Sequence, residues 1–147
     1  MLFQRVNRTD AEKVFVCVYN ASGGAFTVGQ VLQYDVGTSA DGIRVTTPAA
    51  AGLSAFCGLA QAGIANGAYG LAQVFGYNST ASIKPDVTTV LTAGRVMIPV
   101  DTSADLSCAA ASCVASDGKT GFIIAMQTNT TMTTPTASAH KVFIRAL

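Results

Sequence analysis

Residues 13–20 carry the clearest strand pattern in the chain, because β-branched and aromatic side chains run up to a turn-forming segment. The stretch reads KVFVCVYN and is followed by ASGG, which predicts a strand and then a turn. Residues 25–34 predict a second strand. Residues 43–46 alternate apolar and polar positions, as a half-buried strand does, and Pro48 ends that pattern. The intervening residues 35–42 are rich in turn formers.

The middle of the chain contains a short internal repeat on either side of a hairpin signal. The sequence GLAQ at residues 58–61 recurs at residues 70–73. Asn66-Gly67 lies between the two copies and is a favoured hairpin turn, because both residues tolerate a positive φ. We therefore expect two strands joined around this turn. A short helix near residues 49–55 is the alternative, and the glycines of this stretch weigh against it.

A second similarity links two distant segments. Residues 26–32 (FTVGQVL) resemble residues 91–97 (LTAGRVM), and the two segments continue towards Asp35 and Asp101 respectively. Each pattern predicts a strand that begins at a glycine and enters the same kind of position in a sheet. Two short matches do not establish a duplicated unit, since the intervening lengths do not repeat.

The C-terminal third combines loops with two apolar strands. Residues 101–120 have the composition of a loop, whereas residues 121–127 (GFIIAMQ) predict a core strand. Residues 128–138 are rich in threonine and contain a proline, which predicts an exposed loop. Residues 141–147 predict a closing strand.

Short strands separated by turns, without a long helix, predict a mainly β fold: a compact single-domain β-barrel or β-sandwich. We expect one β domain over residues 13–147 and an extended N-terminal arm over residues 1–12. The arm is polar, but Leu2 and Phe3 give it two apolar side chains beside Arg5. Termini of this kind are ordered when they dock onto something.

Composition narrows the class of partner. The chain has 147 residues, of which 50% are hydrophobic and 12% are charged, and its net charge is +1. This balance argues against nucleic acid and against a polybasic membrane anchor. The mean hydropathy of +0.41 comes from small residues, and no apolar run reaches about 18 residues, so we expect no transmembrane segment. The N-terminus also lacks the apolar core of a secretory signal. So little charge indicates a surface covered by copies of the chain or by another protein.

The cysteines and the histidine do not form a metal-binding pattern. Cys17 and Cys57 lie in apolar surroundings, and we expect both to be buried free thiols. Cys108 and Cys113 could form a loop disulfide, although four cysteines allow three pairings and the cytosol is reducing. His140 has no second histidine or close cysteine pair, so we expect a surface or interface histidine, with no metal and no cofactor.

No catalytic motif occurs in the sequence. The dinucleotide-binding G-x-G-x-x-G, the P-loop and the G-x-S-x-G elbow are all absent. Most of the acidic residues lie in predicted turns or at strand ends, where aspartate is favoured for its own hydrogen bonds. We therefore expect that the protein is not an enzyme.

Three segments together resemble the small decoration (cement) proteins of tailed bacteriophage capsids: residues 28–35 (VGQVLQYD), residues 63–76 (GIANGAYGLAQVFG) and residues 93–101 (AGRVMIPVD). The resemblance implies a β-tulip-like fold and a structural role on the outer surface of the virion capsid, after synthesis in the host cytoplasm. It also implies the major capsid protein and sister subunits of a homotrimer as partners, with no cofactor, nucleic acid or membrane. Many weak contacts on a symmetric shell would add up to strong binding.

The resemblance supplies no catalytic residues, so the contact residues are hypotheses. In the arm, the expected capsid contacts are Leu2, Phe3 and Arg5. In the threonine-rich segment, the residues expected to project outwards or to contact a sister subunit are Thr131, Met132 and Thr133. The alternative is a β-barrel adhesion or fibre-base module that recognises a receptor, although the chain lacks tryptophan. The chain looks too small and too rich in strands for a major shell subunit.

Overall fold

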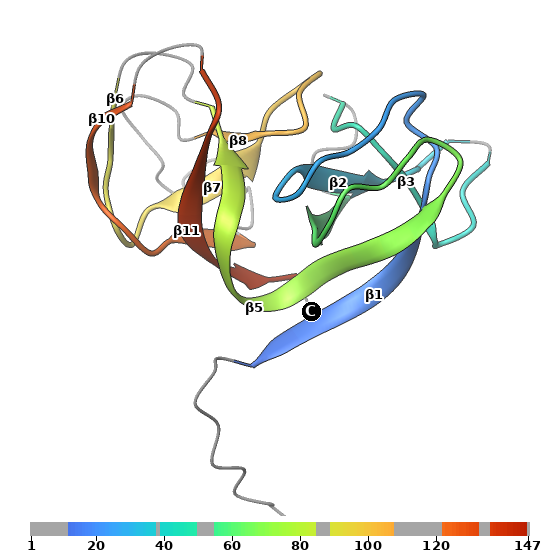
Figure 1. The fold of residues 1–147 in the computed structure, drawn as a ribbon, viewed down its shortest axis with the longest axis horizontal. Coiled ribbons are helices and arrows are strands. Elements are labelled where there is room, and N and C mark those ends of the chain that lie inside the picture. The colour runs from blue at the N-terminus through green and yellow to red at the C-terminus, as the bar shows by residue number, and fades with distance from the viewer. Residues whose placement is uncertain are drawn as a thin grey trace, which may run out of the picture.

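A computed structural model of the chain describes residues 12–37, 39–49, 55–84, 89–107, 122–132 and 136–146. Within these residues the chain forms eleven strands and no helix (Figure 1). The strands are β1 (Lys13–Asn20), β2 (Val31–Tyr34), β3 (Arg44–Thr46), β4 (Phe56–Ala60), β5 (Tyr69–Ile83), β6 (Thr89–Leu91), β7 (Val96–Pro99), β8 (Leu106–Ser107), β9 (Ile123–Ala125), β10 (Asn129–Met132) and β11 (Ser138–Arg145).

Nine of these strands form one sheet in the order β1-β3-β2-β4-β5-β11-β9-β7-β8. Two further pairings, β1 with β5 and β5 with β8, close the sheet into two rings of hydrogen-bonded strands. The first ring contains β1, β3, β2, β4 and β5, and the second contains β5, β8, β7, β9 and β11. The long strand β5 belongs to both rings, and Figure 1 shows it running between them.

The expected fold class is therefore confirmed at the level of a compact, single-domain, mainly β protein. The strand arrangement is one sheet with ring-like bonding, and it is not a clear barrel. β6 and β10 form a separate two-stranded sheet.

The two rings repeat the same pairing pattern. β3 lies between β1 and β2. It is parallel to β1, with Val45 opposite Asn20, and antiparallel to β2, with Val45 opposite Tyr34. Leu106 of β8 has the same arrangement, since it is parallel to Ile83 of β5 and antiparallel to β7. In the second ring, the C-terminal half of β5 thus takes the place of β1, β8 that of β3 and β7 that of β2. The fold is a duplication of one five-stranded unit.

The glycine-initiated segments occupy equivalent positions in these units. Gly29 precedes β2 with a φ of 80°, and Gly94 precedes β7 with a φ of 85°. The N–H of Gly29 donates to the carbonyl of Ala60 at 2.8 Å, and the N–H of Gly94 donates to the carbonyl of Ala125 at 2.8 Å. The expectation drawn from the sequence similarity is confirmed, and the pairing pattern supplies the duplication that the sequence alone left open.

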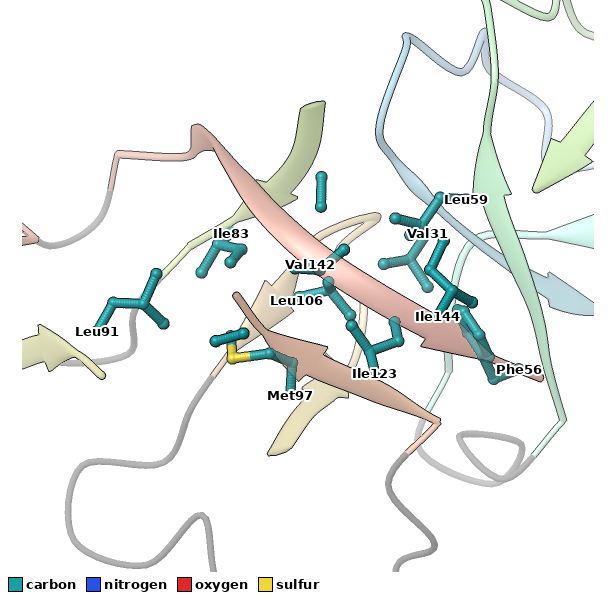
Figure 2. Close-up of a cluster of buried hydrophobic side chains, with 12 residues drawn as sticks. Val31, Phe56, Leu59, Ile83, Leu91, Met97, Leu106, Ile123, Val142 and Ile144 are labelled. Carbon is teal, nitrogen blue, oxygen red and sulfur yellow. The ribbon is translucent and has the colours of Figure 1, made fainter. Parts of the chain in front are cut away.

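The apolar core has one cluster inside the first ring and a larger cluster in the second. The first comprises Val18, Phe26, Leu32, Val45, Cys57, Ala60, Ile64 and Ala72. The larger cluster gathers around β11, as Figure 2 shows, and comprises Val31, Phe56, Leu59, Ala81, Ile83, Leu91, Met97, Leu106, Ile123, Ala125, Val142 and Ile144. Val31, Phe56 and Leu59 come from strands of the first ring, so the second cluster also packs the two rings together.

β5 changes rings at Gly76. This residue pairs with Lys13 of β1 on one side and with Ile144 of β11 on the other. Its φ is 100°, which is a conformation open to glycine, and a Cβ here would overlap the carbonyl oxygen of Glu12. Gly76 therefore lets β1 and β11 approach the same point of β5 from opposite sides.

A buried amide pair reinforces this crossing point. Gln73 and Asn78 are almost fully buried, and the Asn78 side-chain amide donates to the Gln73 side-chain carbonyl at 3.0 Å. The Gln73 amide donates to the main-chain carbonyls of Phe75 and Tyr77, at 3.2 and 3.1 Å. Burying these polar groups costs little free energy, because their hydrogen bonds are made. The bonds link residues on both sides of Gly76, so they stabilise β5 where it passes from the first ring to the second.

The elements predicted near the N-terminus and in the middle largely match the structure. β1 covers residues 13–20 as expected, and β4 and β5 flank the turn at Asn66-Gly67, where Gly67 has a φ of 75°. The strand expected over residues 25–34 is shorter, because the turn at Gly29 interrupts it.

The exposed loop expected over residues 128–138 is wrong in part. Residues 129–132 form β10, which pairs antiparallel with β6, and β11 already begins at Ser138. The alternative of a helix near residues 49–55 and the possible bond between Cys108 and Cys113 fall largely or wholly outside the described residues.

Candidate functional site

The outer face of β1 and β5 in the first ring carries an exposed apolar strip, made of Phe15, Cys17, Tyr69 and Leu71. Successive side chains of a strand alternate between its faces. Val18 on the inner face of β1 is fully buried, whereas Phe15 and Cys17 are exposed on the outer face.

The strip is continuous across the two strands. Cys17 pairs with Leu71, and Tyr19 pairs with Tyr69. The rings of Tyr19 and Tyr69 meet edge to face, with centroids 5.2 Å apart. Leu71 is 50% exposed and Tyr69 is 66% exposed, so large apolar surfaces face outwards side by side. Adjacent exposed apolar side chains of this kind typically mark a site of protein contact.

One end of the strip carries an arginine that is paired with a carboxylate. The guanidinium carbon of Arg44 lies 5.6 Å from the centroid of the Tyr19 ring, within the range of a cation–π contact. The Arg44 Nε also lies 3.4 Å from a carboxylate oxygen of Asp35. Tyrosine and arginine are enriched in the energetically important parts of protein interfaces, so this end of the strip suits recognition of a protein.

Two carboxylates of the described loops accept hydrogen bonds that hold the local backbone in place. One oxygen of Asp41 accepts hydrogen bonds from the N–H groups of Ile43 and Arg44, at 3.0 and 2.8 Å. Asp105 accepts the hydroxyl protons of Ser82 and Ser103, each at 2.6 Å. These contacts agree with the structural role that the sequence predicts for aspartates in turns.

His140 is buried, so its expected placement on the surface is wrong. Its side chain points into the second ring from β11, where Gln127 Nε2 lies 2.7 Å from its Nδ1 and Ser138 Oγ lies 2.7 Å from its Nε2. A histidine can be buried when its ring nitrogens have hydrogen-bonding partners, as they have here. The sequence pattern does not show which residues become those partners, so it did not predict this placement.

This Ser–His–Gln arrangement is not that of an activated serine. Gln127 Oε1 accepts the main-chain N–H of Lys141 at 3.3 Å, which leaves its amide nitrogen to donate to His140 Nδ1. The proton of the neutral ring is then on Nε2, where it is donated to Ser138 Oγ. A general base must instead accept the serine proton at that nitrogen.

His140 predicts an acid-sensitive stability. Burial lowers the pKa of His140 below its ordinary value of 6.5, so the unfolded chain binds this proton first as the pH falls. The stabilising contribution of the neutral ring is complete above pH 6.5 and is lost as the pH falls through the folded pKa. Urea unfolding at a series of pH values should show this loss, and His140→Gln should flatten the profile over that window. An equally steep profile in the variant would contradict the assignment.

The two described cysteines lie in different surroundings. Cys57 is buried as expected, and burial raises the pKa of its thiol to about 11, against a smaller opposing effect of its hydrogen bond with Tyr34. A thiol with such a pKa is a poor nucleophile. Cys17 is exposed, so its expected burial is wrong. The apolar residues around it in the sequence occupy both faces of β1, and Cys17 lies on the outer one.

The described residues contain no group of three or more His, Cys, Asp or Glu side chains placed to hold a metal ion. The same part of the chain contains no helix with the length and apolar character needed to cross a membrane.

None of the residues predicted from the sequence as contacts belongs to the strip. Leu2, Phe3 and Arg5 lie outside the described residues, as does Thr133. Thr131 and Met132 lie in β10. The strip itself was missed, although β1 carried a signal for it: its sequence is apolar at both odd and even positions, which is more than one buried face requires.

No family model matches the chain, and no curated protein matches its sequence.

Proposed function

We propose that the chain is a structural virion protein that binds the outer surface of a tailed-phage capsid and cements neighbouring capsomers. The major capsid protein and further copies of the chain, as a homotrimer, are its partners in this proposal. The support from sequence is the resemblance of the three glycine-containing segments to decoration proteins. A β-tulip-like description of the fold and the arm of residues 1–12 belong to the same proposal.

The observation that carries the assembly role is the exposed apolar strip. A chain with 12% charged residues that leaves Phe15, Leu71 and Tyr69 exposed on one face is built to be covered by protein. The chemistry of the described side chains is compatible with a structural role, because both ring nitrogens of His140 are occupied by hydrogen bonds and burial raises the pKa of the Cys57 thiol.

The test is co-sedimentation of the purified protein with phage heads that lack it. We expect saturable binding at a fixed, high ratio to the major capsid protein. Replacing both Leu2 and Phe3 by serine should weaken binding at least about tenfold, because two apolar side chains are removed from the proposed shell contact. The matched control, Leu2→Ile with Phe3→Tyr, keeps apolar bulk and should bind nearly as the parent chain does.

Circular dichroism and thermal unfolding establish that each arm variant is folded. Unchanged binding of the serine variant would remove the arm from the contact. Absence of the parent chain from the sedimented heads would overturn the capsid proposal, and a few copies per particle would favour a fibre-base component.

A further inference from the structure

The segment that connects β9 to β10, residues 126–128, is bound to β11 at neighbouring points. The main-chain N–H of Met126 donates to the carbonyl of Lys141 at 2.9 Å, and the side-chain carbonyl of Gln127 accepts the N–H of Lys141 at 3.3 Å. The Gln127 amide nitrogen lies 2.7 Å from Nδ1 of His140. Gln127 therefore bridges two consecutive residues of β11 with the two polar atoms of its side chain.

This bridge requires that Nδ1 of His140 carry no proton. The amide nitrogen of Gln127 is a donor, so Nδ1 must accept. The other ring nitrogen, Nε2, donates to Ser138 Oγ at 2.7 Å in the neutral ring. A second proton must therefore bind to Nδ1, where it would face the hydrogen atoms of the Gln127 amide.

Rotation of the Gln127 amide would not restore the bridge. It would bring Oε1 to the protonated Nδ1, but it would also turn the amide nitrogen towards the N–H of Lys141. Two donors would then face each other at that position instead. Protonation of His140 therefore leaves Gln127 with at most one of its two bonds to β11.

The strands next to His140 supply no partner for a charged ring. His140 is almost fully buried, and Ala81 lies opposite it in the pairing of β5 with β11. β6, β7, β9 and the connecting segment 126–128 contain no ionisable side chain. The burial of the ring is therefore not offset by these elements, and it lowers the pKa of His140.

The charged side chains of the adjoining described residues do not favour a charged ring either. Lys84, Arg95 and Lys141 are cations, which oppose protonation of a nearby imidazole. Asp105 accepts the hydroxyl proton of Ser82. Since successive side chains of a strand alternate, this hydroxyl lies on the other face of β5 from the residue opposite the histidine.

The small sheet of β6 and β10 depends on the connecting segment. A two-stranded sheet is only marginally stable by itself. Leu91 holds β6, because its side chain is buried in the larger core cluster. β10 directly follows the connecting segment, so the bonds of Gln127 to β11 hold the start of β10 against the main sheet. Figure 1 shows this small sheet at the end of the molecule away from the first ring.

We propose that His140 and Gln127 form an acid-sensitive switch, which controls whether the connecting segment stays bound to β11. Protonation of Nδ1 releases Gln127, and the segment then separates locally from β11, together with β10, while both rings stay folded. The switch goes beyond the proposed capsid function, because it operates in the isolated chain.

The first experiment follows the single histidine of the chain by NMR. With 15N in the ring, the nitrogen shifts at neutral pH should show a proton on Nε2 and none on Nδ1. Gln127→Glu supplies a carboxylate of similar size that accepts from the protonated Nδ1. The titration midpoint of His140 should therefore move upwards by about one pH unit or more. Met126→Glu is the matched control: it places the same charge on a half-exposed neighbour and should move the midpoint much less.

Hydrogen exchange of the parent chain tests the local release. After correction for the intrinsic effect of pH, protection of the Lys141 amide and of the β10 amides should fall at least about tenfold as the pH passes below the midpoint. The amides of β1 and β4, in the first ring, should keep their protection. In the Gln127→Glu variant, the carboxylate holds the charged ring, so protection should persist to lower pH.

Three results would overturn the proposal: a neutral ring that is protonated on Nδ1, equal midpoints after Gln127→Glu and Met126→Glu, or an acid-induced loss of protection that is spread evenly over both rings. The last would show that His140 acts on global unfolding alone. The tautomer and the exchange of the parent chain decide the question even if Gln127→Glu does not fold. Because the shell is absent from every measurement, the results do not depend on capsid binding.

Discussion

Replacing Gly76 by alanine should lower the free energy of unfolding by about 2–4 kcal/mol, the sum of a strained backbone and an overpacked contact. The φ of 100° strains any residue with a Cβ, and here the added carbon would also overlap the carbonyl oxygen of Glu12. Relief requires β1 to move away from β5, which would weaken the closure of the first ring. Chemical denaturation followed by circular dichroism measures the loss.

Gly94→Ala is the matched control for this substitution. Gly94 has a φ of 85°, but the space around it is open, so only the backbone strain applies. We expect a loss of about 1 kcal/mol. Equal losses in the two variants would show that the overlap with the Glu12 carbonyl adds nothing to the cost of replacing Gly76.

The second large effect is expected at Leu106. This side chain is fully buried in the larger core cluster, and its strand pairs with both β5 and β7. Leu106→Ala should lower the free energy of unfolding by about 2–5 kcal/mol, because it leaves a cavity that closely packed neighbours cannot fill. Leu71→Ala, which truncates a half-exposed leucine, should cost well under half as much.

Hydrogen exchange on the Leu106 variant tests whether the rings unfold together. Since β5 belongs to both rings, amides of β2 and β4 should lose protection along with those of β7 and β9. If β2 and β4 kept their full protection, the rings would be independent folding units, contrary to the shared strand and the common core cluster.

Local sequence patterns correctly predicted the first strand and the turn at Asn66-Gly67, because both depend mainly on the residues within them. The β-branched run at residues 13–20 matches β1, and the glycine at position 67 supplies the positive φ that its turn requires. The similarity of the segments at Gly29 and Gly94 correctly predicted equivalent strand starts. It could not establish the duplication, because the repeated feature is main-chain pairing, which requires no particular side chains.

β10 shows where side-chain composition misleads. Three of the four residues at 129–132 are polar, and the sequence predicts a loop there, yet the backbone of this segment pairs with β6. The equivalent position in the first unit is the isolated bridge between Phe26 and Ile64. Backbone hydrogen bonds require no particular side chain, so only the duplicated topology accounts for this strand.

The candidate site was beyond sequence analysis for a related reason. Both faces of β1 carry apolar residues, and only the closure of the first ring decides that Val18 points inwards and Cys17 outwards. His140 was misplaced because its partners, Gln127 and Ser138, meet it only in the folded chain.

The shared strand also limits how this protein can be divided. The residues of β5 that pair within the first ring are 69–76, and those that pair within the second ring are 75–83. A cut near Gly76 would therefore leave each half with its own part of β5. Such a cut would still divide the larger core cluster, because Val31, Phe56 and Leu59 belong to the first ring, so neither half would keep that cluster whole.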